Sequence, residues 1–122
     1  MIEATDLVRR YLEVWNESDD GVRRATIAAI WADDGCYLDP GAMVTGHDEI
    51  SGLIGTVQER LPGHVFRLLN GVDAHHNVAR FAWQLVPRDG GASVAEGFDV
   101  AVIDADGRIG SILGFLDKTP AA

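Results

Sequence analysis

Residues 93–116 read SVAEGFDVAVIDADGRIGSILGFL, and this stretch decides the fold. Apolar side chains run through residues 93–104, stop at Asp104-Ala105-Asp106-Gly107, and resume over residues 108–116. Aspartate and glycine between two apolar runs are typical of the tight turn in a β-hairpin. The stretch therefore predicts two long neighbouring strands that run antiparallel to each other.

Two further strands are expected directly before this hairpin, over residues 64–74 and 77–87. The connection at residues 88–91 contains Asp89-Gly90-Gly91, which favours a turn, and residues 73–77 form the other connection. Consecutive hairpins place each strand beside the next one along the chain. The second half of the chain is therefore predicted to form a four-stranded antiparallel sheet.

The first half of the chain has the periodicity of helices. Apolar residues recur every three or four positions over residues 3–17, in a second segment ending near Ala32, and in a third from Gly46 to Leu61. A short strand over residues 36–39, with residues 43–45 as its hairpin partner, is expected between the second and third helices. Helices first and strands afterwards are typical of an α+β fold, in which the helices cover the sheet.

Composition limits the classes of protein that the chain fits. Its 122 residues are the usual size of one domain, expected to span residues 1–122, and 47% hydrophobic content is enough for a core. A formal charge of −9 repels phosphate backbones, so nucleic-acid binding is not expected. Short apolar runs and the acidic N-terminus argue against a membrane span or a secretory signal. The single cysteine, Cys36, suits a cytoplasmic protein.

The sequence carries no recognisable metal or cofactor motif. His75 and His76 are adjacent in an expected turn and have no cysteine or glutamate at ligand spacing, so surface histidines are the simpler interpretation. Phosphate-binding glycine loops and the nucleophile elbow of hydrolases are also missing. We therefore expect neither a metal nor a cofactor.

Three polar side chains lie where apolar ones are expected. Tyr11 is on the apolar stripe of the first helix, Asp39 ends a short apolar segment, and Asp99 interrupts an apolar strand. A buried carboxyl must be hydrogen-bonded or protonated, and its pKa rises on burial. Each residue also has an ordinary interpretation: Tyr11 as a core tyrosine, Asp39 as a turn aspartate, and Asp99 as the partner of a cation such as Arg80 or Arg67.

Three segments resemble a known superfamily. They are Val8-Arg9-Arg10-Tyr11 with Trp15-Asn16, then Trp31-Ala32-Asp33-Asp34-Gly35 through Leu38-Asp39-Pro40, then Asp99-Val100 with Gly107-Arg108-Ile109. With them, the chain resembles the nuclear-transport-factor-2-like (NTF2-like, cystatin-like) superfamily, and within it the SnoaL-like branch of ketosteroid isomerases and polyketide cyclases. The resemblance implies a cone of three N-terminal helices packed on a strongly curved antiparallel sheet.

The resemblance also implies roles for the three polar residues. Asp39 corresponds to the general base of the isomerases, while Tyr11 and a neutral Asp99 correspond to the two donors that stabilise an enolate; this tuning of carboxyl pKa values is a known property of ketosteroid isomerase. The implied function is proton transfer on a small hydrophobic carbonyl compound, of the steroid isomerase or polyketide cyclase type, without a cofactor. A non-catalytic ligand-binding or assembly module on the same fold remains the alternative.

The expected pocket wall is apolar. Phe81, Trp83 and Leu85 share one face of their strand, and further wall residues are expected to be Trp15, Met43 and Phe115. Plain core is an equally good interpretation of each of these residues taken singly. Two other activities of the superfamily lack support here. Gly97 replaces the arginine of the Asp-Arg-Asp arrangement in its epoxide hydrolases, and nothing places His64 in the pocket, as its dehydratases require.

The outer face of the sheet is expected to be apolar as well, because it carries Val78, Val86, Val100 and Val102. A monomer rarely exposes so much contiguous apolar surface. We therefore expect a homodimer that forms through this face.

Overall fold

The computed structural model describes residues 3–119, and this part of the chain contains three helices and seven strands. The helices are α1 (Ala4–Asn16), α2 (Asp20–Ile30) and α3 (His47–Arg60). The Asp19 side chain caps α2 by accepting a hydrogen bond from the backbone N–H of Val22. The bounds of α1 and α3 lie within two residues of those that their periodicity predicts, and α2 ends two residues before its predicted end near Ala32.

The seven strands form one mixed sheet. They are β1 (Trp31–Asp39), β2 (Ala42–Thr45), β3 (His64–Leu68), β4 (Asp73–His75), β5 (Val78–Pro87), β6 (Ala95–Ile103) and β7 (Ile109–Lys118). Their order is β2-β1-β7-β6-β5-β3, and β4 pairs with β5 beside β3. The antiparallel meander over β3, β5, β6 and β7 is confirmed.

The sheet also contains one pairing that the sequence did not predict, because β1 pairs with β7 in parallel. Hairpin turns reveal the pairing of strands that follow each other in the chain, whereas β1 and β7 are far apart in sequence. Trp31 belongs to β1 rather than to the second helix, so this strand is longer than predicted. The predicted strand over residues 64–74 is divided into β3 and β4, with residues 69–72 between them.

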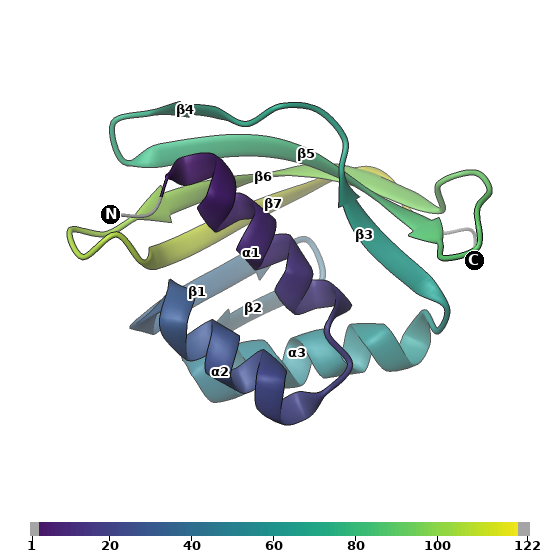
Figure 1. Cartoon of the computed structure of the whole chain (residues 1–122), viewed down its shortest axis with the longest axis horizontal. Coiled ribbons are helices and arrows are strands. Elements are labelled where there is room, and N and C mark those ends of the chain that lie inside the picture. Colours follow the sequence, from purple (N-terminus) through teal and green to yellow (C-terminus); the bar gives the residue numbers. More distant parts are fainter. Residues whose placement is uncertain (1–2, 120–122) are drawn as a thin grey trace.

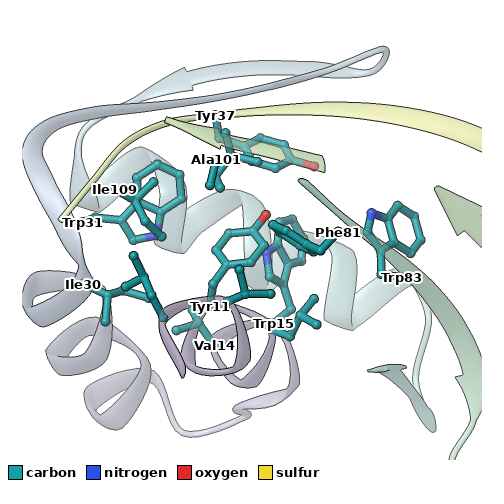
Figure 2. Close-up of a cluster of buried hydrophobic side chains, with 14 of the residues drawn as sticks. Tyr11, Val14, Trp15, Ile30, Trp31, Tyr37, Phe81, Trp83, Ala101 and Ile109 are labelled. Atoms are coloured by element: carbon teal, nitrogen blue, oxygen red, sulfur yellow. The ribbon is translucent and has the colours of Figure 1, made fainter. Parts of the chain in front are cut away.

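The helices cover one face of the sheet, and the core lies between the two layers (Figure 1). Along β5 the buried residues alternate, so that Phe81, Trp83 and Leu85 face the helices. From α1, Tyr11 and Trp15 extend toward these strands, as Figure 2 shows. The site residues therefore lie where the first helix meets the sheet.

The opposite face of the sheet is apolar and partly exposed. In cross-strand register, Met43 of β2 pairs with Leu38 of β1, Leu38 with Leu113 of β7, and Leu113 with Val100 of β6. Val86 contributes little to this surface, because only 6% of it is exposed, contrary to the sequence-based expectation. Within residues 3–119, none of the helices has the length and apolarity needed to cross a bilayer.

Candidate active site

Tyr11 is held rigidly among aromatic rings. It projects from α1 and is 2% exposed, and its ring packs edge-on against Phe81 with the centroids 5.7 Å apart. Trp15 and Trp31 pack around the same ring (Figure 2). Burial raises the pKa of the Tyr11 phenol, and the nearby Asp99 carboxylate raises this pKa further. The phenol is therefore a neutral hydrogen-bond donor at physiological pH.

Asp99 meets Tyr11 across the core. The Tyr11 hydroxyl donates a hydrogen bond to Oδ2 of Asp99 over 3.2 Å, and the indole N–H of Trp83 donates to Oδ1 over 3.0 Å. An indole nitrogen can only donate, so Oδ1 must accept in every protonation state. A proton on Oδ2 can be donated to the Tyr11 oxygen, whereas Trp83 has no acceptor for a proton on Oδ1, so Oδ2 is the favoured position of a proton on Asp99.

Burial raises the pKa of Asp99 to about 6. The hydrogen bonds from Trp83 and Tyr11 oppose this rise, because they stabilise the carboxylate, and the Asp39 charge adds to it. The net rise in the pKa of Asp99 is the direction that the sequence predicts. This pKa is close to neutral pH, so the carboxyl can take up a proton there. An apolar ligand that displaces water from the cavity raises the pKa of Asp99 further.

The sequence also allowed an ion pair between Asp99 and an arginine, and this alternative is wrong. None of the ion pairs among residues 3–119 involves Asp99. Arg80 is on the opposite face of β5, where its guanidinium lies 5.1 Å from the ring centroid of Phe98. Arg67 is exposed on β3. Asp99 is thus a buried carboxyl that neutral donors satisfy.

Asp39 lies at the end of β1 and combines two environments. Its Oδ1 accepts a hydrogen bond from the backbone N–H of Gly41 over 2.8 Å, which is the turn geometry that the Asp-Pro sequence favours. Its Oδ2 accepts a hydrogen bond from the Tyr37 hydroxyl over 2.6 Å. Asp39 is therefore a turn aspartate, as in the ordinary interpretation, and its carboxyl also faces the core.

All three polar residues line one cavity of about 90 Å³. The other lining residues are Leu12, Trp15, Tyr37, Val57, Phe66, Trp83 and Leu116. Aromatic and aliphatic side chains surround the two carboxyls, an arrangement typical of sites that shift pKa values for acid and base roles. Pockets for drug-sized ligands occupy about 300–1,000 Å³, so this cavity fits only a small group in its present form.

The expected wall residues fall into three sets. Trp15 and Trp83 line the cavity. Phe81 is not in this lining and supports the Tyr11 ring, while Leu85 lines a second, neighbouring cavity. The structure corrects the prediction that Met43 and Phe115 belong to the pocket wall. These residues are 77% and 50% exposed and belong to the outer face of the sheet. The alternation of β2 and β7 directs both side chains away from the helices.

Sequence reasoning missed Tyr37 and the hydrogen bond from Trp83. Tyr37 is two residues before Asp39, and strand alternation places both on the same face, so the Tyr-x-Asp spacing was an available signal. Burial raises the pKa of the Tyr37 phenol, and its hydrogen bond to Asp39 raises it further. Tyr37 is therefore a neutral donor that fixes the Asp39 carboxylate.

Two glycines shape this region. A Cβ on Gly97 would lie 2.2 Å from the carbonyl oxygen of Phe115 and 2.7 Å from the Trp83 ring, so no side chain fits there. The arginine of an Asp-Arg-Asp arrangement is thereby excluded sterically as well as by sequence. A Cβ on Gly114 would lie 3.1 Å from Oδ1 of Asp99 and 3.3 Å from Cβ of Asp39, so this glycine allows the two carboxyls to approach.

None of the described residues that line this cavity is a histidine. His64 lines the second cavity instead, and its Nδ1 donates a hydrogen bond to the carbonyl oxygen of Pro62 over 2.9 Å. His75, the last residue of β4, and His76, in the turn that follows, are both exposed. Between residues 3 and 119, the histidine, cysteine and carboxylate side chains form no cluster of three that could hold a metal ion.

Comparison with known proteins identifies the family. The family model of the SnoaL-like domain matches residues 8–112, so the chain belongs to this family and has the NTF2-like, cystatin-like fold. Among solved structures, a protein from Agrobacterium tumefaciens, provisionally named as an isomerase of the SnoaL-like family, is 37% identical with a TM-score of 0.87; the match covers 92% of this chain and 95% of that one.

More distant structures share the fold alone. A provisionally named polyketide cyclase from Sinorhizobium meliloti is 19% identical with a TM-score of 0.69, over 89% of this chain and 93% of that one. A protein of unknown function from Methylobium petroleophilum is 21% identical with a TM-score of 0.73, over 95% of this chain and 76% of that one. A search of curated proteins found no significant match.

Proposed function

We propose that this protein catalyses proton transfer on a small hydrophobic carbonyl compound, as a steroid isomerase or polyketide cyclase does. The supporting observation is that the hydrogen-bonded pair of Tyr11 and Asp99 lines the same apolar cavity as the Asp39 carboxylate. In this proposal Asp39 is the base, and Tyr11 and protonated Asp99 are the two donors to the substrate oxygen. The chemistry requires no further group.

The first step removes a proton from the carbon next to the carbonyl. Asp39 takes the proton, the C–H electron pair becomes the enolate double bond, and the carbonyl π electrons move onto oxygen. The Tyr11 hydroxyl and the proton on Oδ2 of Asp99 turn from each other toward this oxygen and hydrogen-bond to its developing charge. Because the donors are buried, they need only turn toward the oxygen, and they stabilise its charge without reorganisation of solvent.

The second step determines the class of reaction. When Asp39 returns the proton to a different carbon of the enolate, the result is an isomerisation. When the enolate carbon instead attacks a second carbonyl of the same molecule, a carbon–carbon bond forms and a ring closes. The π bond of the second carbonyl breaks, its electrons move onto its oxygen, and this oxygen takes the proton from Asp39. The cavity of about 90 Å³ favours substrates whose reacting part is small.

A non-catalytic ligand-binding module is the second candidate function, and one observation favours it. Both oxygens of Asp39 already accept hydrogen bonds, from the Tyr37 hydroxyl and the Gly41 N–H. A carboxylate oxygen has two lone pairs, so Asp39 can still act as a base. A module that only binds ligands needs no base, so it is compatible with a carboxyl whose two oxygens both already accept hydrogen bonds.

We further propose that two copies associate through the outer face of the sheet. The register row of Met43, Leu38, Leu113 and Val100 lies beside the stacked rings of Phe98 and Phe115, whose centroids are 4.9 Å apart. Met43 and Phe115 are both at least half exposed. A second copy that presents the same face would bury this apolar surface.

The substitution Tyr11→Phe tests the catalytic proposal. It removes one donor to the enolate and keeps the aromatic packing, so the rate of α-proton exchange on a small ketone in deuterated water should fall by about 10²–10³-fold. Ketone affinity should change little, because the second donor remains. Ketone binding without any exchange by the unsubstituted protein would favour the binding module.

A further inference from the structure

A second cavity of about 190 Å³ adjoins the candidate active site and differs from it chemically. Trp15, Val57 and Phe66 line both cavities, so these three residues form the shared wall. The other residues of the second lining come from the ends of α1, α3, β3 and β5: Asn16, Ser18, Gln58, Leu61, Pro62, Gly63, His64, Leu85 and Arg88.

The charges of the two cavities are opposite. The first lining contains two carboxyls, Asp39 and Asp99, and no basic residue. The second lining contains His64 and Arg88 and no acidic residue. In a chain with a formal charge of −9, a cavity whose lining contains a guanidinium and no carboxyl is contrary to the overall balance. A negatively charged group is repelled from the first cavity and attracted to the second.

Most polar groups of the second lining are already committed to the protein. Asn16 donates a hydrogen bond to the carbonyl oxygen of Phe66 and accepts one from its N–H. The Gln58 amide donates to the carbonyl oxygens of Trp15 and Glu17. These side chains shape the cavity but have little left for a ligand.

The Arg88 guanidinium has no such commitment among the described residues. Its backbone N–H donates to the carbonyl oxygen of Gly63 over 2.8 Å, which fixes the position of the residue beside the cavity. Its side chain is in none of the ion pairs found in residues 3–119. His64 keeps Nε2 as its remaining polar atom, because Nδ1 donates to Pro62.

We propose that the second cavity binds a carboxylate of the substrate, so that the substrate is a keto acid whose ketone occupies the first cavity. This inference rests on the proposed proton transfer and adds the substrate class. Arg88 binds the carboxylate, with His64 beside it, and the shared wall of Trp15, Val57 and Phe66 contacts the carbon chain between the two groups. The repulsion from Asp39 and Asp99 fixes the orientation.

Two matched probes test this proposal: 4-oxopentanoate, and 4-oxopentanamide, which has the same shape and no charge. Binding is followed through the backbone amide NMR signals of Gly63 and Arg88. We expect the protein to bind the acid about five- to ten-fold more tightly than the amide, the ratio that one charge-assisted hydrogen bond of about 1–1.4 kcal/mol provides. Equal affinity for the two probes would overturn the proposal.

Variants of Arg88 test whether this residue causes the preference for the acid over the amide. Arg88→Gln should bind both probes equally and keep the affinity of the amide, whereas Arg88→Lys should keep part of the preference. Arg67→Gln is the matched control, because Arg67 is an exposed arginine on the neighbouring β3 and lines neither cavity. A preference that survives in Arg88→Gln, or disappears in Arg67→Gln, would contradict the proposal.

Exchange of the α-protons of the same probes separates this inference from the catalytic proposal. Binding preference that depends on Arg88, with no deuterium incorporation, would support the carboxylate site and refute proton transfer. Exchange of both probes at equal rates and equal affinities would leave proton transfer supported and refute the carboxylate site.

Discussion

The indole N–H of Trp83 donates a hydrogen bond to Oδ1 of Asp99 over 3.0 Å, and Tyr11 lies at the other oxygen of this carboxyl. Trp83 thereby favours Oδ2 as the position of a proton on Asp99, where it can reach a ligand in the cavity. It also stabilises the ionised form and so limits the rise in the pKa of Asp99. One side chain thus controls both the position of the proton and the pH at which it is bound.

Replacing Trp83 by phenylalanine should raise the pKa of Asp99 above its value of about 6, by about one unit, because a donor to the carboxylate is lost. Carbon-13 NMR titration of the Asp99 carboxyl measures this value. Trp31→Phe is the control: Trp31 is also buried, but its indole N–H donates to no group in the described part of the chain. A lowered pKa in Trp83→Phe would show that the indole is not an important donor.

Asp99→Asn should stabilise the protein at pH 8 and have little effect at pH 4. Burial raises the pKa of Asp99 from 3.8 to about 6, so the folded state binds the proton more tightly than the unfolded state. The stability of the unsubstituted protein therefore falls as pH rises from about 4 to about 6 and then stays low. The gain at pH 8 is at most about 3 kcal/mol.

Urea unfolding at the two pH values measures the effect of Asp99→Asn. Asp34→Asn, at an exposed position of β1, is the control and should change stability little at either pH. An Asp99→Asn protein that is less stable than the unsubstituted one at pH 8 would mean that the ionised carboxyl is favourable in the folded state.

Gly97→Ala should destabilise the protein by about 3 kcal/mol or more, because its Cβ would overlap the Phe115 carbonyl and the Trp83 ring. The surviving folded protein should also have a changed Asp99 titration, since Trp83 must move. Gly52→Ala provides the contrast: its Cβ meets nothing within 4 Å, and alanine favours the helix α3. Thermal unfolding of both variants distinguishes the two effects, and equal stability would contradict the predicted overlap.

The proposed dimer predicts a sedimenting mass of twice 13.1 kDa at micromolar concentration. Phe115→Glu should yield monomers, because it places a charge at the centre of the apolar outer face. Val22→Glu, on α2, is a close control because Val22 and Phe115 are each 50% exposed. A monomeric mass for the unsubstituted protein would refute the dimer.

Local patterns predicted most of the fold. The three-four spacing of their apolar residues identified α1 and α3. The Asp-Gly turns before β6 and β7 identified strands whose neighbours in space are also neighbours in sequence. The parallel pairing of β1 with β7 could not be read in this way, since it joins Cys36 to Ser111 and has no turn to signal it.

The candidate site was predictable where a residue conflicted with its surroundings. Tyr11, Asp39 and Asp99 stood out as polar groups in apolar segments, and the structure places all three in one cavity. Met43 and Phe115 are apolar residues on apolar strands, and pattern alone did not show which face of the sheet each occupies. Residues such as Trp83 serve both as core and as hydrogen-bond donor, and only the geometry reveals the second role.

Deuterium incorporation at the α-carbon of a small bound ketone tests the central claim most directly. The unsubstituted protein should catalyse the exchange, Asp34→Asn should match it, and Asp39→Asn should be slower by about 10²–10⁴-fold with ketone affinity nearly unchanged. Exchange no faster than in buffer while the ketone is bound, or an Asp39→Asn rate equal to that of the unsubstituted protein, would contradict the assignment of Asp39 as the base.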